Sequence, residues 1–283
     1  MNPIDLNTYA ENTWCPGCGN FSLLNSFKSA ISELVNDNKL KKEEIVIVTG
    51  IGCHGKMFDY LNLNGFYALH GRAIPTAEGI KLANKKLNVI IFVGDGDCYG
   101  EGIEHLIFAA KRNANITVIV HNNQNYALTT GQFTPTSPWG YKGKSKPQGI
   151  FELPLNPIKL MLSSNASFVA RGFAGDIDHL KNIFKEGITH NGFSFIEVIQ
   201  PEVTWLDTWG FYRAHTKKIP ENHDLSNQEH AMKYANEFDY LNVEDTQMSL
   251  GIFYKKSRKD FEDLEKIKDE KQDMKKHLLN RHY

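Results

Sequence analysis

Hydrophobic positions along this chain alternate between short continuous runs and stretches with helical periodicity. Runs rich in Val, Ile and Phe lie at 44–48, 88–93, 116–120, 167–171 and 193–199, and their length and β-branching are typical of buried strands. Apolar residues recur with helical spacing at 21–35, 76–86, 101–113 and 179–190, which predicts helices. Strands that alternate with helices predict an α/β fold, with a mostly parallel sheet and helices on both faces.

Two regions depart from this pattern. Residues 129–160 contain prolines at 135, 138, 147, 154 and 157, which block regular elements, and a long ordered loop of this kind is typically functional. We expect it to line the mouth of a site. The last stretch, 255–283, is dense in charges of both signs with a thin apolar stripe and predicts an exposed helix. We expect one domain over 1–283 with this charged helical tail.

Composition narrows the class of protein. The chain has 283 residues, 41% of them apolar, and a formal net charge of -1, which gives no electrostatic case for nucleic acid or a membrane surface as partner. No apolar run approaches a membrane span, and the N-terminus lacks the regions of a signal peptide, so we expect a cytoplasmic protein. Four cysteines in a chain of this size favour metal or cluster binding over a disulfide scaffold.

Polar residues follow two neighbouring predicted strands. Gly94-Asp95-Gly96-Asp97 comes directly after 88–93, and Asn122-Asn123 follows 116–120. A β-α-β crossover brings both carboxyl ends to one edge of the sheet, so we expect Asp95 and Asn123 to converge. Carboxylate, amide and carbonyl oxygens suit Mg²⁺, and glycines allow a phosphate to approach the backbone. The pattern predicts Mg²⁺ with a diphosphate. The alternative is a plain Gly-Asp-Gly-Asp turn.

Five ordered motifs within residues 9 to 215 carry a resemblance to a known family. Gly-Asp-Gly followed by Asn-Asn resembles the thiamine-diphosphate enzymes. More narrowly, the chain resembles the β subunit of a 2-oxoacid:ferredoxin oxidoreductase, through the motifs Trp14-Cys15-Pro16-Gly17-Cys18-Gly19, Gly50-Ile51-Gly52-Cys53, His70-Gly71-Arg72-Ala73, Gly94-Asp95-Gly96-Asp97 and Asn122-Asn123-Gln124-Asn125-Tyr126-Ala127-Leu128-Thr129.

The resemblance implies a thiamine-diphosphate-binding fold and a reaction. A 2-oxoacid of the pyruvate or 2-oxoglutarate type would be decarboxylated oxidatively to its acyl-CoA, with electrons passed to ferredoxin. The glutamate that activates the cofactor would come from a partner α subunit, so this chain alone should be inactive. Two alternatives stay open: a non-redox thiamine-dependent decarboxylase or synthase subunit without a cluster, and a non-catalytic scaffold subunit that binds phosphate.

The resemblance also assigns residues. It implies Mg²⁺ ligands at Asp95, Asn123 and the carbonyl of Asn125. It implies contacts with thiamine diphosphate from Ile51, Gly52, Cys53, His54, His70, Gly94, Gly96, Asp97, Ala127 and Leu128. We expect Lys56 to face the substrate carboxylate, with a solvated loop lysine as the alternative, and His70 to exchange protons near neutrality. Thr130 stands where the family usually has a lysine, and His54 where it has a small hydroxyl residue.

The cysteines follow the family pattern only in part. The resemblance implies a [4Fe-4S] cluster held by Cys15, Cys18, Cys53 and a fourth cysteine, but the fourth position reads Glu202. Either Glu202 supplies an oxygen ligand, or the cluster lacks one iron, or there is no stable cluster. Cys98 directly follows the acidic loop and is expected to be a small buried or loop residue.

Overall fold

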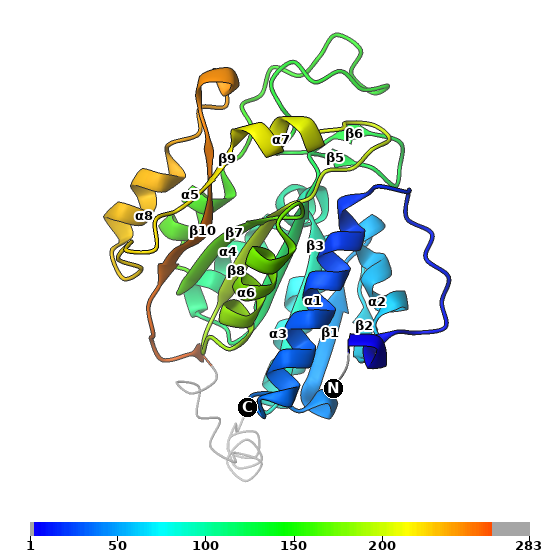
Figure 1. Ribbon diagram of the computed structural model, residues 1–283, viewed down its shortest axis with the longest axis vertical. Helices are drawn as coiled ribbons and strands as arrows, with labels where there is room; N and C mark the ends of the chain where they lie inside the picture. The colour runs from blue at the N-terminus through cyan, green and yellow to red at the C-terminus, as the bar shows by residue number, and fades with distance from the viewer. Residues whose placement is uncertain (1–2, 262–283) are drawn as a thin grey trace, which may run out of the picture.

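A computed structural model describes residues 3–261 and is built around one eight-stranded sheet (Figure 1). The strand order is β2-β1-β3-β4-β8-β7-β10-β9. The strands are β1 (Ile45–Thr49), β2 (Asn64–Tyr67), β3 (Asn88–Gly94), β4 (Thr117–Asn122), β7 (Phe168–Phe173), β8 (Ser194–Ile199), β9 (Thr216–Lys218) and β10 (Met248–Lys255). From β2 to β7 every pairing is parallel, and β10 then pairs antiparallel with β7. The sheet is therefore mostly parallel, as predicted.

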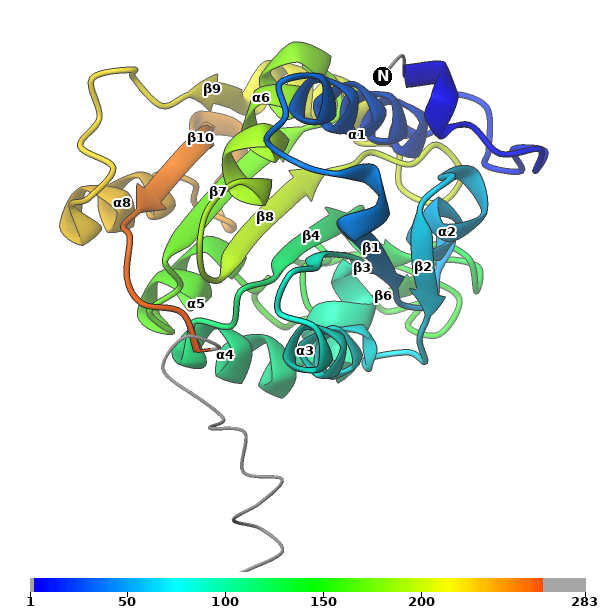
Figure 2. The ribbon, with the colours of Figure 1, turned by 90° about the horizontal axis from the view of Figure 1, so that it is seen from below.

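Helices cover both faces of the sheet (Figure 2). Residues of α1 (Gly19–Asn36), α2 (Met57–Tyr60) and α6 (Ile177–Ile188) form one hydrophobic core with one face, while α3 (Ala73–Ala83), α4 (Ile103–Arg112), α5 (Pro157–Ser163) and α8 (Gln228–Ala235) form a second core with the other. The remaining helix, α7 (Trp209–His215), covers neither face and lies above the carboxyl ends of the strands in Figure 1. The central strands are fully buried because both of their faces are covered.

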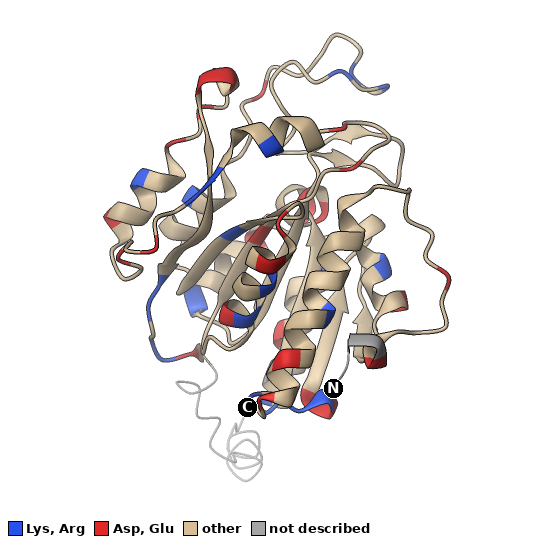
Figure 3. Cartoon of the chain, in the orientation of Figure 1, with Lys and Arg blue, Asp and Glu red and all other residues tan. Residues whose placement is uncertain are grey.

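Short turns complete the elements. The 3₁₀ turns are η1 (Pro3–Leu6), η2 (Lys42–Glu44), η3 (Cys53–Lys56) and η5 (Val243–Asp245), and η4 (Gly96–Glu101) is a π-helical turn directly after β3. A two-stranded sheet pairs β5 (Asn125–Tyr126) with β6 (Gln132–Phe133). Acidic and basic residues are interspersed along the described chain (Figure 3), in keeping with its net charge of -1.

The strands and helices predicted before residue 200 are all present, with small shifts at their ends. The largest shift is in α3, which the sequence places at 76–86 after Pro75. The helix begins instead at Ala73 and takes Pro75 into its first turn, where no intrahelical N–H donor is needed. Within the predicted irregular region 129–160, residues 134–156 contain no helix or strand, but the prediction is wrong at both ends, where β6 occupies 132–133 and α5 begins at Pro157. A proline fits at the start of α5 because the first helical position needs no N–H donor.

The C-terminal region tests the predictions less fully. The charged helix predicted at 255–283 falls mostly on residues 262–283, which lie outside the described residues. Its first residue, Lys255, ends strand β10 instead. No helix within residues 3–261 is long and apolar enough to cross a membrane.

Candidate active site

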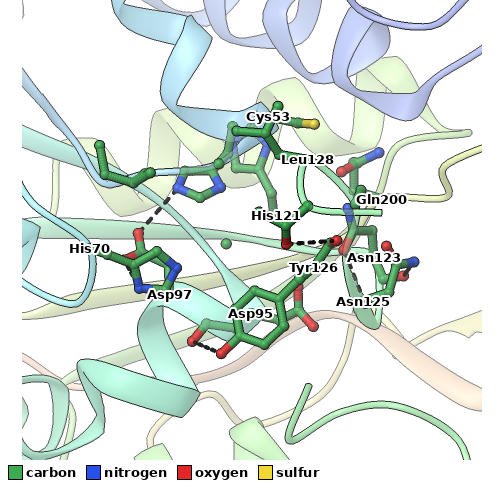
Figure 4. Close-up of a pocket in the computed structure, with 17 residues that line it drawn as sticks. Cys53, His70, Asp95, Asp97, His121, Asn123, Asn125, Tyr126, Leu128 and Gln200 are labelled. Atoms are coloured by element: carbon green, nitrogen blue, oxygen red, sulfur yellow. Dashed lines mark hydrogen bonds and ion pairs between the residues drawn. The ribbon is translucent and has the colours of Figure 1, made fainter. Parts of the chain in front are cut away.

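One pocket lies at the carboxyl ends of the parallel strands. Its walls come from the loops after β1, β2, β3, β4 and β8. Thirteen of the residues that the sequence assigns to cofactor or Mg²⁺ line it, namely Ile51, Gly52, Cys53, His54, His70, Gly94, Asp95, Gly96, Asp97, Asn123, Asn125, Ala127 and Leu128. Sequence reasoning missed His121, Tyr126, Thr129 and Gln200, which also line it. Figure 4 shows His70 and Asp97 on one side of the pocket, Asn123 and Asn125 on the other, and Asp95 between them.

Asp95 lies buried at the floor of the pocket, with 1% of its surface exposed. Its Oδ2 accepts hydrogen bonds from Thr134 Oγ1 at 2.5 Å and Thr136 Oγ1 at 2.7 Å. Burial raises the pKa of the Asp95 carboxyl to about 6, although these hydroxyls and nearby backbone amides act in the opposite direction. No Lys or Arg is among the main contributions to this balance from the described residues. A divalent cation would therefore favour the charged carboxylate.

The two asparagines beside Asp95 are held by local hydrogen bonds. Asn123 Oδ1 accepts from the Asn125 backbone N–H at 3.2 Å, and Asn125 Nδ2 donates to the Asn123 carbonyl at 3.0 Å. Asn125 Oδ1 is buried and has no hydrogen-bond partner within residues 3–261. An unpaired buried oxygen is costly, so this atom suits a ligand or ion in the pocket.

The opposite wall is a chain of acidic and histidine side chains. His54 Nε2 lies 3.1 Å from Asp97 Oδ2, and the Gly71 backbone N–H donates to Asp97 Oδ1 at 2.5 Å. His70 Nδ1 lies 3.5 Å from the same Oδ1 and contacts Glu101. Gly94 leaves the space for His54, because a Cβ on Gly94 would come within 2.7 Å of His54 Nδ1. Asp97 thus connects the two histidines predicted to contact the cofactor.

His121 presents a neutral imidazole to the pocket. Its Nδ1 lies 2.7 Å from Asn20 Oδ1, and because an amide oxygen only accepts, Nδ1 carries the proton. Burial, with a smaller contribution from His54, holds the pKa of His121 well below its usual value. Its Nε2 is buried without a partner among the described residues. The sequence offered one indication of this role, since His121 is a histidine at the end of an otherwise apolar strand.

A second pocket adjoins the first and contains the thiols. Cys15, Cys18, Cys53, Lys56 and Glu202 line it, and it shares Cys53, Asn123, Ala127 and Leu128 with the first pocket. Lys56 therefore lies at the thiol pocket and does not line the first pocket. Cys98, by contrast, is fully buried in the hydrophobic core, as expected.

Cys18 and Cys53 sit in a setting that raises their pKa values and so disfavours free thiolates. Burial, opposed in part by the Asn20 backbone amide and reinforced by the neighbouring Cys53 and Cys15, raises the pKa of Cys18 to about 11. The sulfurs nevertheless receive hydrogen bonds: Gln200 Nε2 donates to Cys18 Sγ at 3.3 Å, and Thr204 Oγ1 donates to Cys15 Sγ at 3.4 Å. Within residues 3–261 no three Cys, His, Asp or Glu side chains are placed to hold a single metal ion. An iron–sulfur cluster does not need its ligands around one point, because each thiolate binds a different iron of the cluster.

Glu202 is engaged by its own turn. Its carboxylate accepts hydrogen bonds from the backbone N–H groups of Thr204 at 2.5 Å and Trp205 at 2.7 Å, and also from that of Leu206. Asn125 Nδ2 donates to the same carboxylate at 3.2 Å. The side chain is 4% exposed. Glu202 therefore accepts hydrogen bonds from the backbone amides of its own turn and from the side chain of Asn125, a residue of the predicted Mg²⁺ site.

Known proteins match this chain along most of its length. Residues 50–198 match the family model of the thiamine pyrophosphate enzyme C-terminal TPP-binding domain, and residues 203–269 match that of the C-terminal part of the pyruvate ferredoxin oxidoreductase β subunit. A 2-oxoacid:ferredoxin oxidoreductase subunit β from Saccharolobus solfataricus is 47% identical over 215 residues, which cover 75% of this chain and 69% of the relative. The subunit β of 2-oxoacid:ferredoxin oxidoreductase 1 from Aeropyrum pernix is 40% identical over 266 residues, covering 89% and 80%.

A solved structure matches the whole fold. The 2-oxoglutarate:ferredoxin oxidoreductase from Magnetococcus marinus, with 2-oxoglutarate, coenzyme A and succinyl-CoA bound, superposes with a TM-score of 0.91 at 32% identity. The match covers 100% of this chain and 97% of that one.

Proposed function

This chain belongs to the family of 2-oxoacid:ferredoxin oxidoreductase β subunits, and from that membership we propose a role for each part of its site. The enzyme is thiamine-dependent and decarboxylates a 2-oxoacid oxidatively. The observation that carries the proposal is the convergence of Asp95, Asn123 and Asn125 in one pocket inside the region that matches the thiamine pyrophosphate model. The whole chain, 1–283, would serve as one such domain.

Thiamine diphosphate with Mg²⁺ would occupy the first pocket. The Asp95 carboxylate, the Asn123 side chain and the Asn125 backbone carbonyl offer the hard oxygen atoms that Mg²⁺ prefers. The buried side-chain oxygen of Asn125, Oδ1, has no partner among the described residues and supports a ligand beside it. The residues for the cofactor's diphosphate and ring are Ile51, Gly52, Cys53, His54, His70, Gly94, Gly96, Asp97, Ala127 and Leu128. The cofactor supplies the carbon nucleophile and the electron sink.

Two side chains would act on substrate and protons. Lys56 lies at the adjoining pocket, which shares Asn123 and Leu128 with the cofactor pocket, so its ammonium would hold the carboxylate of the 2-oxoacid. His70 is 30% exposed at the pocket wall and is oriented by Asp97 and Glu101. That placement suits proton exchange between the site and solvent.

The pocket would be completed by a partner α subunit. Among the described residues that line it, the acidic side chains are Asp95 and Asp97, and none is a glutamate. Two apolar side chains that line it are exposed, Leu128 at 53% and Ile51 at 36%. A second chain packed over this pocket would bury them and supply the missing carboxylate.

Three thiolates would hold an iron–sulfur cluster in the second pocket. Cys15, Cys18 and Cys53 converge there, and iron would supply the positive charge that thiolates in this buried setting lack. The carboxylate of Glu202 already accepts four hydrogen bonds, which favours a structural role for it and leaves one iron without a protein ligand. The cluster supplies one-electron transfer toward ferredoxin, and coenzyme A would take the acyl group.

Turnover by the assembled α and β subunits tests this function. With thiamine diphosphate, Mg²⁺, coenzyme A and 2-oxoglutarate or pyruvate, we expect two one-electron reductions of ferredoxin for each acyl-CoA formed, because the oxidation releases two electrons. Release of aldehyde without reduced acceptor would support the non-redox alternative instead. An assembly that binds the cofactor and turns over neither substrate would support the scaffold alternative.

A further inference from the structure

A buried ion pair lies in the middle of the sheet, behind the cofactor pocket. Arg171 on β7 and Glu197 on β8 are directly opposite each other in register, and Arg171 Nε donates to Glu197 Oε2 at 2.7 Å. Their side chains are 2% and 1% exposed. Desolvation largely cancels the attraction in such a pair, so stability alone explains it poorly. Its neighbours indicate another role.

Glu197 fixes the orientation of the Asn122 side chain. A carboxylate only accepts hydrogen bonds, so it must face the amide's NH₂ group, and Asn122 Nδ2 lies 2.7 Å from Glu197 Oε1. Asn122 Oδ1 is consequently turned the other way. There it faces Thr136 Oγ1 at 3.0 Å and accepts from the Gln124 backbone N–H at 3.2 Å.

Thr136 stands between this amide and Asp95. Its hydroxyl has one proton and two acceptors, Asn122 Oδ1 at 3.0 Å and Asp95 Oδ2 at 2.7 Å. The single proton serves both acceptors in a three-centre bond, with the shorter contact to Asp95, whose Oδ2 also receives the Thr134 hydroxyl. Both hydroxyls come from the Pro-rich loop. Gln124 holds this loop in place, because its Nε2 donates to the Thr136 backbone carbonyl at 3.0 Å. Two hydroxyl donors on Oδ2 fix the plane of the carboxylate, so that Oδ1 would be the oxygen presented to a cation.

We propose that Thr136 is a positioning residue for the cation at Asp95, and that Arg171 and Glu197 act through Asn122 to hold it in place. The inference rests on the proposed Mg²⁺ site. It goes beyond that site because it makes metal affinity depend on an ion pair three hydrogen-bonded side chains away. Partners behind a metal ligand commonly change metal affinity by about 10–100-fold when they are removed.

The test measures Mn²⁺ binding to the assembled α and β subunits, saturated with thiamine diphosphate, from the EPR signal of free Mn²⁺. Thr136→Val keeps the volume and removes the hydroxyl, and we expect Mn²⁺ affinity to fall about tenfold or more. Thr136→Ser restores the hydroxyl and should restore affinity. Thr117→Val removes a buried hydroxyl at the opposite end of β4 and should leave affinity unchanged. If the valine variant does not assemble, Thr136→Ala removes the same hydroxyl without branching.

A second substitution tests the connection to the ion pair. Arg171→Lys should weaken Mn²⁺ binding in the wild-type background and have no further effect in the Thr136→Val background, since it acts through Thr136. Fully additive losses would overturn that connection. Unchanged affinity in Thr136→Val, with clear Mn²⁺ binding by the wild type, would overturn the inference alone. A wild-type assembly that binds thiamine diphosphate with no Mn²⁺ would overturn the proposed metal site, and the inference with it.

Discussion

Glu202 offers the sharpest mutational test, because two roles for its carboxylate lead to opposite results. If the Glu202 carboxylate binds iron, Glu202→Cys should bind that iron more tightly and Glu202→Gln should lose it. If the carboxylate instead accepts the hydrogen bonds of its own turn, Glu202→Gln should keep most of those hydrogen bonds and Glu202→Cys should lose them. The structure favours the second role, since three backbone N–H groups and Asn125 Nδ2 donate to this carboxylate.

The expected cost of each substitution follows from the number of amides it leaves without an acceptor. Alanine or cysteine at 202 removes the acceptor for three amides, and each costs about 1 kcal/mol because Thr204 and Trp205 are exposed enough for water to replace it. The total is about 3 kcal/mol of folding free energy. Glu202→Gln keeps an oxygen at Oε1, which accepts the hydrogen bonds from Trp205, Leu206 and Asn125. It loses the hydrogen bond from the Thr204 backbone N–H, which lowers the folding free energy by about 1 kcal/mol.

Iron and sulfide analysis of anaerobically prepared α–β assemblies, with their melting temperatures, measures both effects. We expect Glu202→Gln to keep the wild-type iron content with a slightly lower melting temperature, and Glu202→Cys to be less stable. Glu202→Ala should match the cysteine variant in stability. The reasoning is refuted if Glu202→Cys gains iron and oxygen tolerance while Glu202→Gln loses iron.

Three further outcomes are expected. The chain without its α partner should not decarboxylate pyruvate or 2-oxoglutarate, and measurable turnover would contradict the two-chain site. Lys56→Ala should raise the KM for the 2-oxoacid about tenfold with a smaller change in kcat, whereas Lys111→Ala, at an exposed position on α4, should not, and equal effects of both would remove Lys56 from the site. Burial, together with Lys255, lowers the pKa of His190 from 6.5 to about 4, so the unfolded chain binds more protons between these values and stability should fall as pH drops through that window. Urea midpoints measured against pH should show a flatter profile for His190→Gln, and parallel profiles would contradict the assignment.

The core of the fold could be predicted because its strands are fully buried. Runs such as 88–93 and 116–120 are apolar on both faces, and the crossover rule then fixes where Asp95 and Asn123 meet. Strand β2 (Asn64–Tyr67) gave no such signal, since all four of its residues are exposed at the edge of the sheet. Strand β10 was also missed, because it pairs antiparallel after a long polar segment.

The surroundings of the site could not be predicted from local patterns. Thr134 and Thr136 reach Asp95 through an irregular loop, and nothing in their own stretch of sequence indicates that contact. Glu197 reads as a single charge in an apolar strand, and its partners Arg171 and Asn122 come from two other strands. The family resemblance assigned the groups that would touch the cofactor. The groups behind them depend on long-range packing.

Calorimetric titration of thiamine diphosphate into the assembled α and β subunits, with and without Mg²⁺, tests the central assignment most directly. The variants are Asp95→Ala and Asn123→Ala, with Asp178→Ala as control, a carboxylate whose side chain is 91% exposed on α6. We expect Mg²⁺-dependent binding by the wild type and the control, and its loss in both site variants with the two subunits still assembled. Undiminished cofactor affinity in either site variant would contradict the Mg²⁺ site at Asp95.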